Sequence, residues 1–261
     1  HSSKRPRILI GKDTRKSGDM LEAALTAGLC SMGAKVIPLG VVPTPAVAYL
    51  TRYYKADAGV VISASHNPCE YNGIKFFNSD GYKLSDGIEN EIESYILGEK
   101  AIEELPTHGK VGYVSANHNA VEDYVAFAVS TIDCRLDGMK IAVDCANGAS
   151  YETAFKALNK LGANVEAIHN TPDGVNINHM CGSTHMESLQ AYVTSIGADI
   201  GIAFDGDADR MLAVDENGKL IDGDQIMAAC AKFMRDNGTL KQNTLVATVM
   251  SNLGLFMAGE K

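Results

Sequence analysis

Apolar and polar positions follow two different rhythms near the start of the chain. Residues 7–10 form a short apolar run, and apolar residues then recur at helical spacing between residues 21 and 32. Gly33 interrupts this spacing, and residues 35–39 form a second short apolar run. The pattern predicts a strand, a helix and a second strand, an arrangement that normally belongs to a parallel sheet.

The same order of elements returns in the middle of the chain. We expect a strand over residues 141–144, a helix over 151–161 that stops at Gly162, and a strand over 164–168. The phrases MGAKV and LGANV fall at matching points of the two units. We therefore predict an α/β fold of tandem duplicated α/β domains with mixed, mainly parallel sheets. The alternative is that α/β units share helix-glycine-strand punctuation without duplication.

A polar, irregular stretch separates the two units. Residues 98–119 contain proline and glycine and suit a linker before a helix over residues 121–130. We accordingly predict a first domain over residues 1–112, a second over 113–221, and the incomplete start of a third over 222–261.

Toward the end of the chain the pattern changes again. Residues 211–214 and 219–221 indicate a hairpin, and residues 224–234 a helix. We expect a buried strand over residues 244–250, followed by another helix start. Because the chain begins at His1 rather than Met, we also expect its amino-terminal boundary to be artificial.

Charge and composition narrow the class of partner. The formal net charge is −9 without a long block of Lys or Arg, which argues against nucleic acid or an anionic membrane as the main partner. The six cysteines include no CxxC pair, which favours reduced thiols and a cytoplasmic location. No apolar run approaches the roughly 18 residues that span a bilayer, and no signal-peptide pattern opens the chain. A phosphorylated substrate would therefore need a bound metal or individual Arg and Lys side chains.

One candidate site follows a predicted central strand. Residues 58–62 are apolar, so residues 63–68 lie at the carboxyl end of a strand, where open α/β sheets place their sites. Ser65 would stand at the crest of this turn. A serine hydroxyl needs a base or a metal to become a nucleophile, and either Lys75 or His66 could exchange its proton. The alternative is a structural serine-rich turn, since adjacent residues need not face each other.

A second candidate site is acidic. Asp205, Asp207 and Asp209 alternate between two apolar runs, and a curled loop could converge them on one cation. Carboxylates without a nearby His or Cys favour Mg²⁺ over zinc. Three such charges repel by several kcal/mol at an effective dielectric near 20, which a cation would relieve. A phosphate on Ser65 would be a further oxygen ligand of the metal, and Arg210 could hold the outer oxygens of that phosphate.

An EF-hand and a solvated turn are weaker alternatives for the acidic loop. An EF-hand would use Glu216 at its twelfth position, but Arg210 stands where the sixth position requires glycine, and both flanks are predicted strands. A solvated acidic turn would leave the arginine beside three acids without a reason.

Two further patterns are less specific. Arg15 follows the first strand and could face phosphate, although a surface ion pair is an equal alternative. His179, Cys181 and His185 are close enough in sequence to suggest zinc, but no second ligand pair stands at zinc-finger spacing.

Taken together, these strings resemble the α-D-phosphohexomutase superfamily, and most closely its branch that acts on glucosamine phosphates. Residues 63–68 (SASHNP) look like its phosphoserine loop, and residues 204–210 like its magnesium loop, with Ala208 where many members have Gly. Residues 172–178 (PDGVNIN) and Ser63, where other branches usually carry Thr, are similar to the glucosamine branch.

The resemblance implies interconversion of glucosamine 6-phosphate and glucosamine 1-phosphate, with glucosamine 1,6-bisphosphate as intermediate and activator. It implies a small sugar phosphate as partner, Mg²⁺ as cofactor and four α/β domains in the full architecture, and it leaves a homodimer open. The residues it assigns are Ser65 as phosphoryl carrier, His66 and Lys75 for proton transfer, Arg15 and Arg210 for phosphate, and Ser65, Asp205, Asp207 and Asp209 for the metal.

Set against the resemblance, this sequence departs from the full family pattern. We expect the segment before the first strand, the sugar-recognition loop of the third domain and the fourth domain to be missing from a molecule that ends at Lys261. We therefore expect the chain alone to bind Mg²⁺ yet turn over little substrate. Rival interpretations are a phosphomannomutase or phosphoglucomutase, a non-catalytic metal-binding α/β module, and a serine hydrolase, which the missing G-x-S-x-G motif disfavours.

Overall fold

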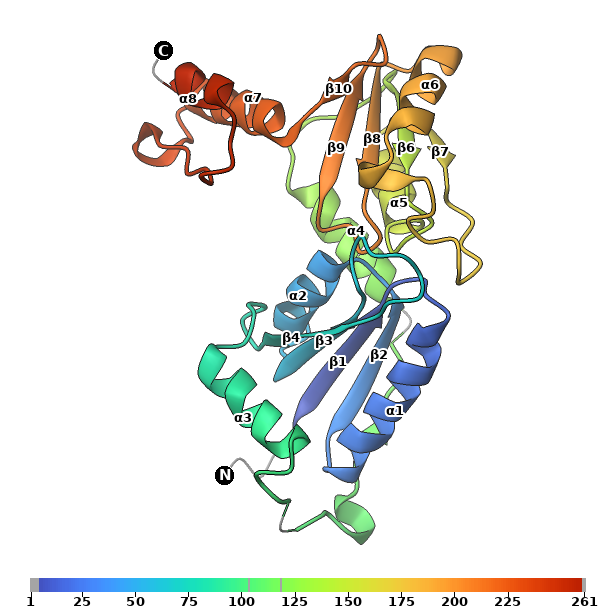
Figure 1. The fold of residues 1–261 in the computed structure, drawn as a ribbon, viewed down its shortest axis with the longest axis vertical. Helices are drawn as coiled ribbons and strands as arrows, with labels where there is room; N and C mark the ends of the chain where they lie inside the picture. Colours follow the sequence, from blue (N-terminus) through green and yellow to red (C-terminus); the bar gives the residue numbers. More distant parts are fainter. Residues whose placement is uncertain (1–4, 103, 118, 260–261) are drawn as a thin grey trace.

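Two sheets with helices packed on their faces make up most of the molecule (Figure 1). The computed structural model describes residues 5–102, 104–117 and 119–259. The remaining positions, which fall within the three predicted domains and the predicted linker, lie outside the described residues.

The first sheet has the strand order β4-β3-β1-β2-β5. β1 pairs in parallel with β2 and β3, β2 in parallel with β5, and β3 antiparallel with β4. This confirms the predicted βαβ unit. The last strand extends the sheet past the boundary that we predicted at residue 112. The strands are β1 (Arg7–Lys12), β2 (Lys35–Val41), β3 (Ala58–Ile62), β4 (Ile74–Asn78) and β5 (Tyr113–Val114).

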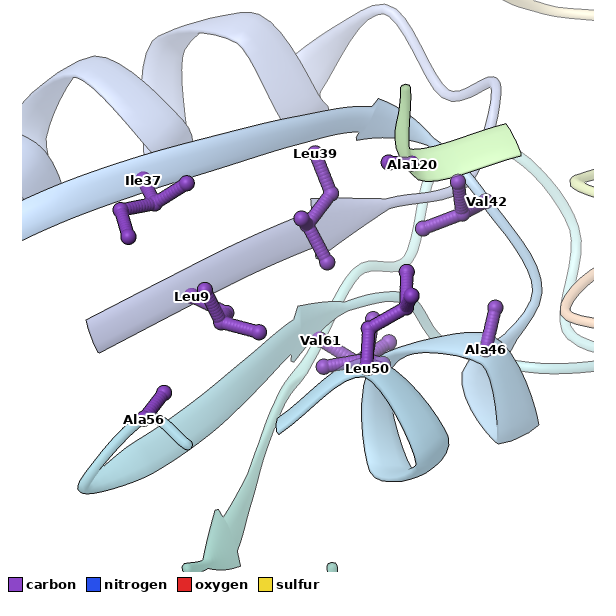
Figure 2. Close-up of a cluster of buried hydrophobic side chains, with 10 residues drawn as sticks. Leu9, Ile37, Leu39, Val42, Ala46, Leu50, Ala56, Val61 and Ala120 are labelled. Carbon is purple, nitrogen blue, oxygen red and sulfur yellow. The ribbon is translucent and has the colours of Figure 1, made fainter. Parts of the chain in front are cut away.

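Helices cover both faces of this sheet. Helix α1 (Ser17–Ser31) packs on the face that carries Ile8 and Ile10, and α2 (Thr44–Tyr53) on the face that carries Leu9. Neighbouring strand residues point to opposite faces, so burial of both faces explains why β1 is a continuous apolar run. Leu50 of α2 lies over the central strands (Figure 2). Helix α3 (Asp86–Ile96) and the short η1 (His108–Lys110) follow.

The second sheet has the strand order β10-β9-β8-β6-β7, and four of its strands repeat the plan of the first sheet, whereas its fifth strand, β10, joins the opposite edge from β5. β6 pairs in parallel with β7 and β8, just as β1 pairs in parallel with β2 and β3. β8 pairs antiparallel with β9, just as β3 pairs with β4. The shared topology confirms the predicted duplication. The predicted hairpin is also present, between β9 and β10. The strands are β6 (Lys140–Asp144), β7 (Asn164–Ile168), β8 (Ile200–Phe204), β9 (Met211–Asp215) and β10 (Leu220–Ile221).

Helix α4 (Ala120–Ser130) connects the two sheets and packs on both units. Ala120 belongs to the same apolar core cluster as Leu50 and lies near Leu39 and Val42 (Figure 2). From the same helix, Glu122 pairs with Lys156 at 2.6 Å and Lys160 at 2.9 Å. Both lysines belong to α5 (Thr153–Lys160), so α4 fastens the first unit to the second. The second unit also contains α6 (Glu187–Ile196) and η2 (Gly182–Thr184).

The last segment contains helices and no strand among its described residues. Asp222 caps α7 (Gly223–Asp236) through a capping box with Gln225, and η3 (Lys241–Asn243) and α8 (Leu253–Gly259) follow. The strand predicted over residues 244–250 is wrong: these residues are irregular and exposed, Val249 to 96%. Their apolar, β-branched sequence favours a strand, but a strand needs a neighbour to pair its backbone groups, and no described strand lies beside it.

No described helix is long and apolar enough to cross a membrane. All six cysteines are free thiols.

Candidate active site

The two predicted loops meet at the junction between the sheets (Figure 1). The loop after β3 carries Ser65, and the equivalent loop after β8 carries the aspartates. The Ser65 hydroxyl donates a hydrogen bond to Oδ2 of Asp205 at 2.8 Å, and Nη2 of Arg210 donates to Oγ of Ser65 at 3.2 Å. Ser65 is 8% exposed, so its hydroxyl meets a carboxylate and a guanidinium in a mostly enclosed place.

The three aspartates converge as the sequence predicts. One carboxylate oxygen from each of Asp205, Asp207 and Asp209 lies within 4.8 Å of the others. Asp205 and Asp207 are each 1% exposed, although buried carboxylates are costly without partners. Oδ2 of Asp207 accepts from Lys75 at 2.6 Å and from Thr44 at 2.7 Å, whereas its buried Oδ1 has no hydrogen-bond partner among the described residues.

These observations fit a hard divalent cation. Clustered carboxylate oxygens are the ligands that Mg²⁺ prefers, and a buried carboxylate oxygen without a donor has a lone pair available for a metal. The described residues of this loop therefore suit Mg²⁺ better than zinc, which prefers nitrogen and sulfur.

The two buried carboxyls have opposite pKa shifts. Burial raises the pKa of Asp205, and the hydrogen bond from Ser65 only partly opposes it. Burial also raises the pKa of Asp207, but hydrogen bonds from Lys75 and Thr44 outweigh it, so this pKa lies below its ordinary value. The protein partners of Asp207 therefore hold its carboxylate ionised, whereas the ionised form of Asp205 is one that a bound cation would stabilise.

The two proton-transfer candidates are placed differently. Lys75 on β4 reaches the acidic loop, with Nζ at 2.6 Å from Asp207 and 3.6 Å from Asp209. Its side chain is 38% exposed, so it can face both the loop and a ligand. His66 lies on the exposed side of its loop, and no described residue forms a hydrogen bond with its side chain. The structure thus brings Lys75 to the acidic loop but does not fix His66 there.

The two predicted phosphate-binding arginines also differ. Arg210 is 54% exposed on its side chain and lies beside Ser65 and Asp209, where a phosphate oxygen could reach it. Arg15, in contrast, is 0% exposed on its side chain. All of its N–H groups donate to Asp13 and to carbonyl oxygens of the Ser65 loop, so no donor remains for phosphate. The expectation that Arg15 faces phosphate is therefore wrong.

The weak zinc pattern of His179, Cys181 and His185, which the sequence disfavoured, does not come together as a cluster among the described residues. Cys181 lies near Asp144 and His169 rather than beside His179 and His185. Asp144 is fully buried and accepts hydrogen bonds from two backbone N–H groups and from Nδ1 of His169 at 2.9 Å. These three contacts satisfy its carboxylate without a metal.

Sequence reasoning also missed contributors to the site. Thr44 donates to Asp207 from the first unit, and Asn178 of the second unit donates to the Ser65 loop. Thr44 carries no local signal, because it follows an ordinary strand and starts a helix. Asn178 ends the PDGVNIN string. Asparagine and glycine are typical of turns, but they do not indicate which distant segment a turn contacts.

Three family models match the chain in order along its length. They describe the alpha/beta/alpha domains I, II and III of phosphoglucomutase/phosphomannomutase and cover residues 1–103, 121–218 and 222–261. The chain belongs to the phosphoglucomutase/phosphomannomutase family. Its Ser65 and aspartate loops accordingly lie in domains I and II of that family.

Among curated proteins, the chain is similar to phosphoglucosamine mutases. It is 63% identical over 250 residues to that of Acetivibrio thermocellus and 62% identical over 250 residues to that of Ruminiclostridium cellulolyticum. In both cases the match covers 96% of this chain and 56% of the relative, so the chain spans about half the length of these family members.

Solved structures show the same fold. A phosphoglucomutase/phosphomannomutase family protein from Burkholderia thailandensis is 28% identical with a TM-score of 0.74, covering 89% of this chain and 51% of that one. A phosphomannomutase homologue from Thermus thermophilus superposes with a TM-score of 0.75 at 24% identity, over 90% of this chain and 54% of that one, and supports the fold alone.

Proposed function

We propose that this chain is the part of a phosphoglucosamine mutase that carries the phosphoserine and the Mg²⁺ ion. In the whole protein it would serve the interconversion of glucosamine 6-phosphate and glucosamine 1-phosphate. The curated relatives above 60% identity that carry the name phosphoglucosamine mutase support this substrate class. A cytoplasmic location agrees with the free thiols.

The observation that carries the proposal is the position of the Ser65 hydroxyl. Its oxygen contacts Asp205 and Arg210, which both come from the other unit. An acidic metal loop on one side and a cation on another are the surroundings that a phosphate on this oxygen requires. A purely structural serine would need neither.

The chemical step would proceed from glucosamine 1,6-bisphosphate. The Ser65 oxygen forms a bond to phosphorus while the bond from phosphorus to the sugar oxygen breaks. Ser65 loses its hydroxyl proton and the departing sugar oxygen takes up one proton, with Lys75 as the group that exchanges both, so atoms and charges balance. His66 is the alternative donor because it adjoins Ser65 on the exposed side. In the reverse step, the phosphoserine would return its phosphoryl group to the one free hydroxyl of a monophosphate, the 6-hydroxyl of glucosamine 1-phosphate or the 1-hydroxyl of glucosamine 6-phosphate.

The remaining residues would manage charge. Asp205, Asp207 and Asp209, with the Ser65 phosphate, would hold Mg²⁺, which when bound neutralises the transferring phosphoryl group. Arg210 would hold an outer phosphate oxygen, since its guanidinium already contacts Ser65.

Intact-mass spectrometry tests this proposal. The purified chain is incubated with Mg²⁺ and glucosamine 1,6-bisphosphate, and a Ser65→Ala variant is treated in the same way. Ser130→Ala, which removes a hydroxyl from the exposed end of α4, is the matched control. We expect one added phosphate on the wild-type and control chains and none on Ser65→Ala.

Two outcomes would count against the proposal. Phosphate that persists in Ser65→Ala would show that another residue is the carrier. Faster labelling by glucose or mannose 1,6-bisphosphate than by the glucosamine compound would favour a phosphoglucomutase or phosphomannomutase instead.

A further inference from the structure

We propose that Arg15 and Asn178 are positioning residues that clamp the Ser65 loop from opposite sides and hold the carrier serine in its reactive orientation. This inference rests on the proposed role of Ser65 as phosphoryl carrier. It assigns to Arg15 a function different from phosphate binding, and it makes the second unit responsible for the shape of a loop that belongs to the first.

Arg15 forms the first half of the clamp. Its Nη2 donates to the carbonyl of Ser65 at 3.0 Å and to that of Asn67 at 2.8 Å. Nη1 donates to the carbonyls of Pro68 and, at 3.0 Å, Tyr71. Its planar fork thus holds four carbonyl oxygens of a single loop. A lysine has one ammonium with three donors and could not satisfy the same four oxygens.

Asn178 forms the second half. Its Nδ2 donates to the same two carbonyl oxygens, at 2.8 Å to Ser65 and 3.0 Å to Asn67, although it lies 113 positions from Ser65. Asn178 is 8% exposed and has a left-handed backbone with φ of 57°. Asn tolerates this conformation better than most residues. The carbonyl of Ser65 is therefore held from both units at once.

The clamp matters because Ser65 has an unfavourable backbone conformation. Its φ is 53°, a left-handed value that L-residues other than Gly rarely adopt. Ser63 holds the other side of the residue: its Oγ accepts from the Ser65 N–H at 2.9 Å and donates to Asp13 at 2.6 Å. Asp13 in turn accepts from Arg15 at 2.8 Å. The contacts of Arg15 therefore reach both the carbonyl and the N–H of Ser65.

Asn178 is itself fixed to the second sheet. Its N–H donates to the carbonyl of Ala146 at 3.0 Å, in the loop after β6. Asp144 is the last residue of β6, and its carboxylate accepts hydrogen bonds from the N–H groups of Ala146 at 2.8 Å and Gly182 at 2.9 Å. Asn178 lies in the segment between these two residues. The buried Asp144 carboxylate thus holds in place the segment that carries Asn178.

The orientation of the Ser65 oxygen follows from these contacts. With its N–H and carbonyl both fixed, the residue can direct Oγ to the 2.8 Å contact with Asp205 and the 3.2 Å contact with Arg210. A displacement of a catalytic group by about 1 Å can lower the reaction rate by about 100-fold. Loss of either half of the clamp should therefore slow transfer to Ser65 without removing any group that touches the phosphate.

The test compares Asn178→Gly and Arg15→Lys with Asn176→Gly. Glycine accepts the left-handed backbone at position 178, so this variant removes the amide donor without adding strain. Asn176 is the matched control, because it lies in the same segment and its hydrogen bonds to described residues stay within its own unit. Arg15→Lys keeps the buried charge beside Asp13.

Three quantities are measured for each variant: hydrogen–deuterium exchange of the peptide over residues 63–72, Mg²⁺ affinity by calorimetry, and the rate of phosphate uptake from glucosamine 1,6-bisphosphate. We expect the exchange rate of this peptide to rise by about tenfold or more in both clamp variants. Exchange of the other peptides, and of every peptide in the control, should stay at the wild-type rate. Phosphate uptake should fall by about tenfold or more, with Mg²⁺ affinity changed less than about twofold.

Exchange of this peptide that stays at the wild-type rate in Asn178→Gly would overturn the proposal. An equal rise in exchange in the control Asn176→Gly would overturn it as well. If Arg15→Lys fails to fold, Asn178→Gly alone decides. If the wild-type chain takes up no phosphate, the proposed function fails while the exchange measurements still decide whether the clamp exists.

Discussion

The hydroxyl of Ser65 lies 2.8 Å from a carboxylate oxygen of Asp205, although 140 positions separate the two residues. Both residues stand in the same place of the duplicated unit, in the loop between a central strand and its antiparallel neighbour. Under the proposed function, one copy of the unit would supply the phosphoryl carrier and the other the metal ligands. Contact between the two copies brings the site together.

Loss of Asp207 should remove most Mg²⁺ binding. Its buried Oδ1, which has no partner among the described residues, and its place among three carboxylates support its proposed role as a principal ligand. We expect Asp207→Asn to weaken Mg²⁺ affinity by about tenfold or more. Mg²⁺ at about 100 times its dissociation constant should stabilise the wild-type chain by about 2.7 kcal/mol and the variant far less. Thermal unfolding with Mg²⁺ and with EDTA measures this difference. Asp80→Asn, on an exposed turn, should respond to Mg²⁺ as the wild type does.

Removal of the Lys75 charge should separate metal binding from catalysis. Its ammonium lies 2.6 Å from Asp207 and therefore competes with a cation for the same carboxylate. We expect Lys75→Gln to bind Mg²⁺ about two- to fivefold more tightly, since an ion pair of this exposure is worth about 1 kcal/mol or less. Phosphate uptake by Ser65 should nevertheless fall, because the proton donor is lost. Calorimetry and intact-mass kinetics give the two numbers, and weaker Mg²⁺ binding would contradict the competition.

Gly206 should not tolerate a side chain. A Cβ at this position would lie 2.6 Å from the carbonyl oxygen of Ser65 and 2.7 Å from Nδ2 of Asn178. We expect Gly206→Ala to lower the free energy of unfolding by about 1–3 kcal/mol, through overpacking at the contact between the units. Gly28→Ala is the control, since a Cβ there meets nothing and alanine favours the helix by about 0.5–1 kcal/mol. Urea unfolding of both variants should therefore shift in opposite directions.

The pair of Asp144 and His169 should make stability depend on pH. The hydrogen bond that His169 donates to the Asp144 carboxylate raises the pKa of His169, and burial opposes it only in part. Because the folded pKa lies above the ordinary value of 6.5, the stabilisation is complete below that pH and is lost as pH rises through the folded pKa. Burial raises the pKa of the neighbouring Cys181 to about 12, so its thiol stays neutral over this range.

His169→Gln, which does not titrate, tests this dependence. The difference in unfolding free energy between wild type and variant should be largest at acidic pH and should shrink as pH rises above 6.5. A difference that stays constant across this range would show that the protonated imidazole does not contribute.

Much of the fold and of the site's chemistry could be predicted from local sequence. The 3.6 and 2.0 periodicities decide which segments become helices and strands, and glycines such as Gly33 and Gly162 mark where helices end. Loops at the carboxyl ends of central strands meet at one edge of an α/β sheet, so Ser65 and the three aspartates could be recognised by residue type and place.

Only the tertiary structure decided how these residues are used. Arg15 is charged and follows a strand, which suggests an exposed phosphate ligand, yet four carbonyl oxygens from a distant loop allow it to be fully buried. Residues 244–250 have the composition of a strand but lack a described neighbour to pair with. Periodicity and turn chemistry are properties of a few consecutive residues, whereas burial of a charge and pairing of a strand depend on partners that distant segments supply.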